Sequence, residues 1–104
     1  MYLYNLKWHK DAEAEFMALL SQNELNEATD ILSLADYMAE KGFDLRNVHR
    51  SVNGSAIYKR QPRRYLFMVT VEQPPSGPAP GGDMRILAIG TNLAAVEANA
   101  IKRI

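Results

Sequence analysis

The chain has 104 residues with twelve basic and twelve acidic side chains, so its formal net charge is zero, and 47% of its residues are hydrophobic. This composition is typical of a folded protein and argues against intrinsic disorder, and the length predicts a single domain spanning residues 1–104. The sequence has no cysteine, which excludes disulfides, thiolate metal sites and cysteine nucleophiles. We find no secretion signal and no apolar run long enough to span a bilayer, so we expect a cytoplasmic protein without a membrane partner.

The zero net charge conceals an uneven distribution. Residues 1–44 contain three lysines and nine carboxylates, whereas residues 45–72 contain six lysines and arginines and one carboxylate, Glu72. Such a separation predicts an acidic half and a basic half, with the basic half facing an anionic partner.

The first half of the sequence predicts one strand and two helices. Residues 2–8 alternate between apolar and polar positions, as in a strand. Asp11 is the expected N-cap of a helix over residues 12–20. A capping box from Ser21 to Glu24 opens a second helix over residues 22–41, and Gly42 ends it.

The second half predicts strands and a final helix. Asn53-Gly54 favours a hairpin between strands at 48–52 and 56–60. Pro62 cannot donate to a central ladder, so we expect a turn at 61–63 before a central strand over 65–73. A Pro/Gly loop over 73–83, expected to be mobile, leads to a strand over 84–89, and Thr91 or Asn92 caps the last helix.

The predicted order is therefore β-α-α-β-β-β-β-α. We expect an α+β domain in which an antiparallel sheet of about four to five strands carries an N-terminal helical hairpin and a C-terminal helix.

The basic half contains a dense cationic run. Lys59, Arg60, Arg63 and Arg64 fall within six positions, and Arg46 and Arg50 lie upstream. Guanidinium groups can bind phosphate bidentately and can stabilise the charge of a phosphoryl-transfer transition state. The alternative is an exposed hairpin whose charges prevent edge-to-edge aggregation.

Histidines and tyrosines supply further candidates. His9 and His49 are the only histidines. His49 stands between Arg46 and Arg50 and could transfer protons, whereas a structural or surface role is favoured for His9. Tyr58 and Tyr65 flank the basic run and could stack on nucleobases, although aromatic residues at strand spacing more often belong to the core. No pattern of metal ligands or cofactor-binding motif is present, so we expect neither a metal nor a cofactor.

Three stretches resemble the RelE/ParE toxin superfamily in order and spacing over most of the chain. They are the opening YNLKWHKDAEAEF, the segment AIYKRQPRRYLFMVTVEQ at residues 56–73, and the closing strand MRILAIG. The middle segment carries Tyr58-Lys59-Arg60 and then Arg64-Tyr65-Leu66-Phe67. The resemblance implies a bacterial or phage toxin with a protein antitoxin. In the RelE branch it implies a metal-independent endoribonuclease that cuts messenger RNA on the ribosome, where the ribose 2′-hydroxyl attacks the adjacent phosphate.

The resemblance also implies roles for individual residues. Arg60 and Arg64 match positions that bind the substrate phosphate or stabilise the transition state. To these catalytic candidates we add His49 and Lys59 for proton transfer. The expected nucleic-acid-binding residues are Arg46, Arg50, Arg63, Tyr58 and Tyr65.

Two departures keep other functions open. The tail ILAIGTNLAAVEANAIKRI, where active members commonly carry a catalytic arginine, has only Lys102 and Arg103 as cations, and the chain is neutral where such toxins are basic. Three hypotheses therefore stand: a ribosome-dependent ribonuclease, a non-catalytic nucleic-acid- or protein-binding module of the same fold, and a small interaction module that docks through its helices.

Overall fold

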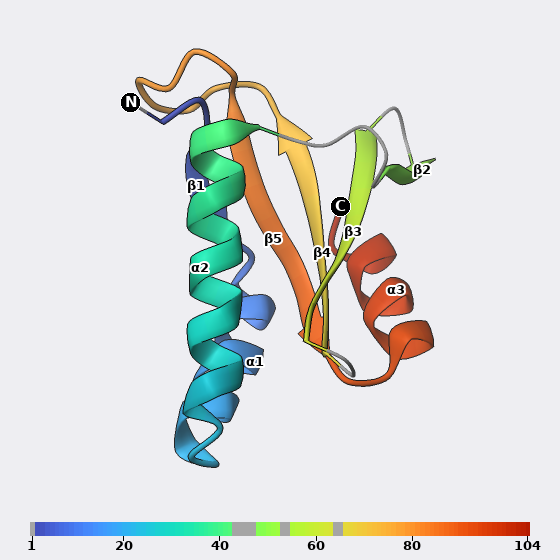
Figure 1. The fold of residues 1–104 in the computed structure, drawn as a ribbon. Helices are drawn as coiled ribbons and strands as arrows, with labels where there is room; N and C mark the ends of the chain where they lie inside the picture. The colour runs from blue at the N-terminus through green and yellow to red at the C-terminus, as the bar shows by residue number, and fades with distance from the viewer. Residues whose placement is uncertain (1, 43–47, 53–54, 64–65) are drawn as a thin grey trace.

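The computed structural model describes residues 2–42, 48–52, 55–63 and 66–104 (Figure 1). The observed order confirms the predicted α+β class. Among the described residues, no helix combines the length and the hydropathy that crossing a membrane requires. The elements are β1 (Asn5–Trp8), α1 (Lys10–Ser21), α2 (Leu25–Lys41), β2 (Val48–Val52), β3 (Ser55–Arg63), β4 (Leu66–Gln73), β5 (Asp83–Gly90) and α3 (Leu93–Lys102).

The five strands form one sheet in the order β1-β5-β4-β3-β2. Strands β2 to β5 are a meander of antiparallel neighbours. The first strand lies at the outer edge beside β5 and runs parallel to it, with Asn5 opposite Asp83 and Trp8 opposite Ile86. The sheet is therefore mixed: the expected antiparallel pattern holds for β2 to β5 but not for β1.

The helices cover both faces of the sheet, so the domain has three layers (Figure 1). The pair α1 and α2 packs on one face over a core that includes Ile31, Met38 and Ile86. The last helix, α3, packs on the other face over Ile57, Val69 and Leu87. Strand β4 contributes to both cores, which confirms its predicted central position.

Two of the predicted helix starts are wrong in detail. The N-cap of α1 is His9, not Asp11, and its Nδ1 accepts a hydrogen bond from the Asp11 backbone N–H at 3.1 Å. The N-cap of α2 is Glu24, and its side chain makes no capping hydrogen bond, so the predicted capping box does not form. Gly42 ends α2 at a positive φ of 93°, and Asn92 caps α3, as predicted.

Strand β3 continues through residues 61–63, where Pro62 had predicted a turn. It runs to Arg63, and its register against β4 shifts between Arg60 and Arg63. This β-bulge explains the difference, because a proline without an N–H is tolerated where the ladder is interrupted.

Beyond the end of β1, side chains instead of a neighbouring strand hydrogen-bond to the backbone of β5. The Ile89 backbone N–H donates to Glu15 Oε1 at 3.0 Å, and Arg103 Nη1 donates to the Leu87 carbonyl at 2.8 Å. Arg103 and Glu15 also form a bidentate ion pair, at 2.9 and 3.1 Å. Their hydrogen bond and charge interaction raise the pKa of the guanidinium against the opposing effect of burial. The ion pair thus joins α1 to the end of α3 and closes this stretch of sheet edge.

We expect Arg103→Met to lower the free energy of unfolding by about 2 kcal/mol, because the partly buried Glu15 carboxylate and the Leu87 carbonyl lose their donor. Urea unfolding measures the change. Lys102→Met, at the exposed neighbouring position, is the control and should alter stability little. Equal losses in the two variants would contradict a role for this ion pair.

Candidate functional site

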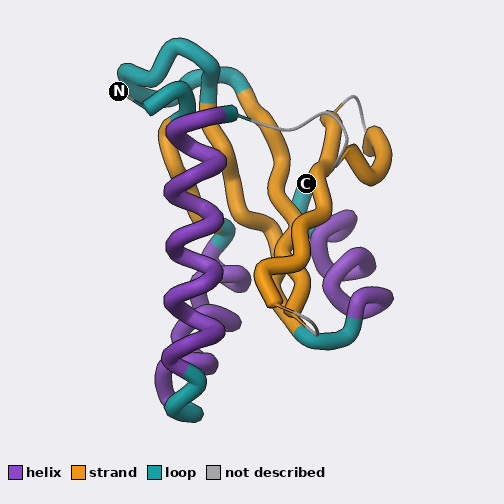
Figure 2. Tube along the Cα trace, viewed as in Figure 1, coloured by secondary structure: helices purple, strands orange, loops and turns teal. Residues whose placement is uncertain are grey.

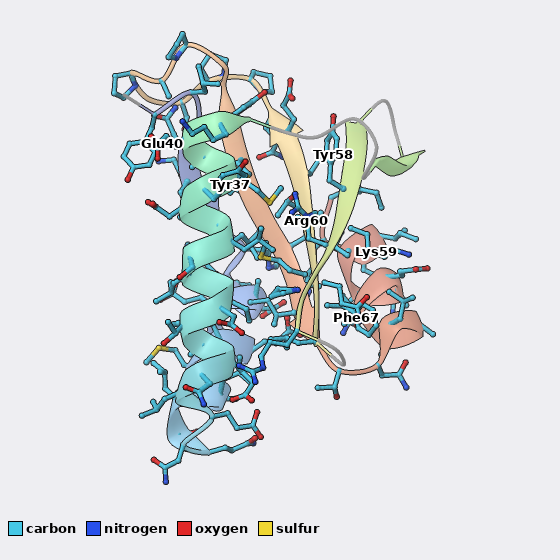
Figure 3. All side chains as sticks on the ribbon, viewed as in Figure 1. Tyr37, Glu40, Tyr58, Lys59, Arg60 and Phe67 are labelled. Atoms are coloured by element: carbon cyan, nitrogen blue, oxygen red, sulfur yellow. The ribbon has the colours of Figure 1, made fainter. Side chains whose placement is uncertain are left out.

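The described cations of the basic run do not share one surface. Arg60 and Tyr58 point toward α2, whereas Lys59 points toward α3 (Figure 3). The strand register agrees, since Arg60 pairs with Met68 of the α1/α2 core and Lys59 pairs with Val69 of the α3 core. Alternation of side chains along a strand separates the two charges.

Arg63 is held by carboxylates of α2. Its Nη1 lies 3.0 Å from Asp30 Oδ2, and its Nε lies 3.8 Å from Glu27 Oε1. Arg63 was predicted to bind nucleic acid, but its positive charge is therefore compensated by carboxylates of the same chain.

The remaining predicted site residues divide into two groups. His49 and Arg50 lie on β2 at the edge of the sheet. Arg46, Arg64 and Tyr65 lie outside the described residues.

A hollow of about 450 Å³ lies beside Arg60, between α2 and the bulge of β3. Among the described residues Arg60 makes no ion pair, so its guanidinium can meet an anion there.

Tyr58 is only 5% exposed, which leaves its ring little surface for a nucleobase. Burial and the nearby Glu72 raise the Tyr58 pKa. The residues that line the hollow beside Arg60 are Asp30, Ser33, Leu34, Arg60, Gln61 and Pro62.

A larger hollow of about 520 Å³, which we call the tyrosine–proline hollow, lies on the other flank of α2. Its walls come from the N-terminal segment, the second half of α2 and the Pro/Gly loop between β4 and β5. No local pattern in the sequence indicates this hollow, because the three segments are far apart in the chain. Its lining residues are Tyr2, Tyr4, Asn5, Leu6, Asp36, Ala39, Pro78, Ala79 and Pro80.

The Pro/Gly loop arches over the end of the sheet beside the N-terminal segment (Figure 2). Asn5 is its main anchor: the amide donates to Asp83 Oδ1 at 2.9 Å, and its oxygen accepts from the Ala79 N–H at 3.2 Å. A second tie runs from the Gly81 N–H to the Leu3 carbonyl at 2.7 Å. A Cβ at Gly81 would lie 2.6 Å from that carbonyl oxygen, so the close approach requires glycine. The loop is thus bonded to the N-terminal segment, and its expected mobility stays a prediction.

The Asp83 carboxylate fixes the other end of this loop. It accepts hydrogen bonds from the backbone N–H and the hydroxyl of Ser76 as well as from Asn5. Burial opposes ionisation of this carboxyl, but the hydrogen bonds outweigh it and lower the pKa of Asp83 below 3.8.

The two tyrosines of the hollow are held through their hydroxyl groups. Tyr2 donates to Asp36 Oδ1 at 2.7 Å, and Tyr4 donates to Glu72 Oε2 at 3.0 Å. Burial and this second hydrogen bond raise the pKa of Tyr4 to about 12, so its hydroxyl stays protonated near neutral pH. Both tyrosine rings are therefore held in place as uncharged walls of the hollow.

Within the described part of the chain, no group of three or more histidine, aspartate or glutamate side chains is placed to hold a metal ion. Comparisons of the chain with protein-family models, with curated proteins and with solved structures find no match. The resemblance to RelE/ParE toxins therefore stays a prediction.

We expect Asp83→Asn to destabilise the fold by about 2 kcal/mol at pH 7, because charge-assisted hydrogen bonds to the loop are lost. A carboxyl whose folded pKa is depressed stabilises the fold above its unfolded pKa, here near 3.8, and loses that contribution as the pH falls through the folded value. The gap between the two proteins should therefore shrink below about pH 4. Urea unfolding at pH 7 and pH 3 checks this, with Glu13→Gln as an exposed control, and a gap of the same size at both pH values would contradict it.

Proposed function

We propose that the chain is a non-catalytic protein-binding module that holds an extended segment of a partner protein in the tyrosine–proline hollow. The observation that carries this proposal is the hollow itself, a concave and largely apolar surface with a few polar groups, Asn5 and Asp36 among them. Binding sites for ligands commonly have this composition.

The walls of the hollow suit an extended chain. Grooves lined by aromatic rings recognise extended peptide segments, and tyrosine side chains lose little conformational entropy on binding. Hydrogen bonds already hold Tyr2, Tyr4 and the loop in place. Such preorganisation lowers the ordering cost of association.

The described catalytic candidates favour binding over chemistry. Arg60 and Lys59 lie on opposite faces of the sheet, and Arg103, a cation of the tail, is engaged by Glu15 and the Leu87 carbonyl. A phosphoryl-transfer site needs cations and proton-transfer groups that converge on one phosphate.

Short random peptides displayed on phage and selected on the immobilised protein test the module. We expect the selected peptides, once synthesised, to lose about tenfold or more of their affinity for Tyr2→Ala, since an aromatic anchor in an interface contributes about 1–2 kcal/mol. Tyr37→Ala is the matched control, because Tyr37 is an exposed tyrosine of α2 outside the lining. Equal affinities for Tyr2→Ala and the wild type would refute binding at this hollow.

A toxin-like ribonuclease is the second candidate, favoured by the position of Arg60 in the smaller hollow beside Ser33. It predicts that tightly induced expression arrests bacterial growth and that Arg60→Ala restores growth, because the phosphate loses its guanidinium partner. Lys102→Ala, on the opposite side of the sheet, should remain toxic. Normal growth with the wild-type chain would remove this candidate and leave the binding module.

A further inference from the structure

The wall of the tyrosine–proline hollow that α2 provides is negatively charged. Asp36 lines the hollow, and Glu40 follows one turn later on the exposed surface of the same helix. Their field reaches the Tyr2 hydroxyl: the hydrogen bond and charge of Asp36, with a smaller contribution from Glu40, raise the pKa of Tyr2.

No described cation contacts the Asp36 carboxylate. The nearest basic residue along the helix, Lys41, lies 3.8 Å from Glu40 instead, and both of these side chains are largely exposed. Tyr2 donates to one oxygen of Asp36, and a carboxylate has further lone pairs for a charged donor.

The end of α2 adds to the negative potential. The hollow reaches Ala39 in the last turn of the helix, where the aligned peptide dipoles place partial negative charge. The Ala39 carbonyl already accepts hydrogen bonds from the Leu3 and Tyr4 N–H groups, which bring the two tyrosines to this end of the helix. Aromatic rings attract cations through the negative potential of their faces.

We infer that the tyrosine–proline hollow takes a positively charged side chain, arginine or lysine, from the bound segment, with Asp36 as its ion-pair partner and Tyr2 and Tyr4 as its aromatic walls. This inference rests on the proposed function and specifies the ligand. The prolines of the loop contact the neighbouring apolar part of the same segment.

The test compares two peptides that differ in charge alone. Ac-Pro-Arg-Pro-NH2 and the same peptide with citrulline in place of arginine are titrated into the labelled protein, and NMR shifts report binding at Tyr2 and Tyr4. We expect the arginine peptide to bind about threefold tighter, because Asp36 is exposed and an exposed ion pair changes affinity only a few-fold. The preference should fall as salt is added.

Two variants of Asp36 separate charge from folding. Asp36→Asn should abolish the preference for arginine, whereas Asp36→Glu should retain it, and Glu13→Gln controls for a change in net charge elsewhere. Equal binding of the two peptides at the tyrosines would overturn the cationic specificity and leave the binding module standing. If neither peptide binds but neutral peptides are selected from the phage library, the inference again fails alone. If neither peptide binds and the library yields no peptide sensitive to Tyr2→Ala, both proposals fail.

Discussion

The contact between the Asn5 amide and the Asp83 carboxylate, at 2.9 Å, holds together the segments that build the larger hollow. Asn5 starts β1, Asp83 starts β5, and both bond to the loop that precedes β5. Because buried polar groups need partners, each of these bonds also satisfies a group that would otherwise oppose folding. The position of the tyrosines relative to the prolines follows from this junction.

The opposite charges of the two halves of the sequence meet inside the fold. Carboxylates of the helical hairpin bind Arg63 of the basic half, and they also bind Arg103, which follows α3 and lies outside that half. The acidic half thus neutralises part of the basic half, and fewer cations remain to face an external anion than the sequence implied. On the other flank of α2, Glu40 pairs only with the exposed Lys41 among the described cations. Asp36 makes no ion pair with any described cation.

The side-chain patterns in the sequence predicted where the helices and strands lie and which faces are apolar. They did not predict which elements pack against one another. Alternation along β4 places Phe67 and Val69 in the core beneath α3, and Leu66 and Met68 in the core beneath α1 and α2. The same alternation implies that Lys59 and Arg60 diverge. Nothing local indicates that β1 joins β5 or that Arg63 reaches Asp30, since these contacts depend on tertiary packing. The tyrosine–proline hollow was missed for the same reason, because its walls come from distant segments.

The parallel pairing of β1 with β5 has a consequence for the order in which the chain folds. The junction residues Asn5 and Asp83 are separated by 78 positions, so closing this contact costs more loop entropy than forming the helical hairpin or the β2–β5 meander. Local units gain their contacts earlier, and long-range pairings slow folding. Strand β1 is synthesised before β5 and can complete the sheet only after β5 has formed. The tyrosine–proline hollow therefore forms late, when the two segments have come together.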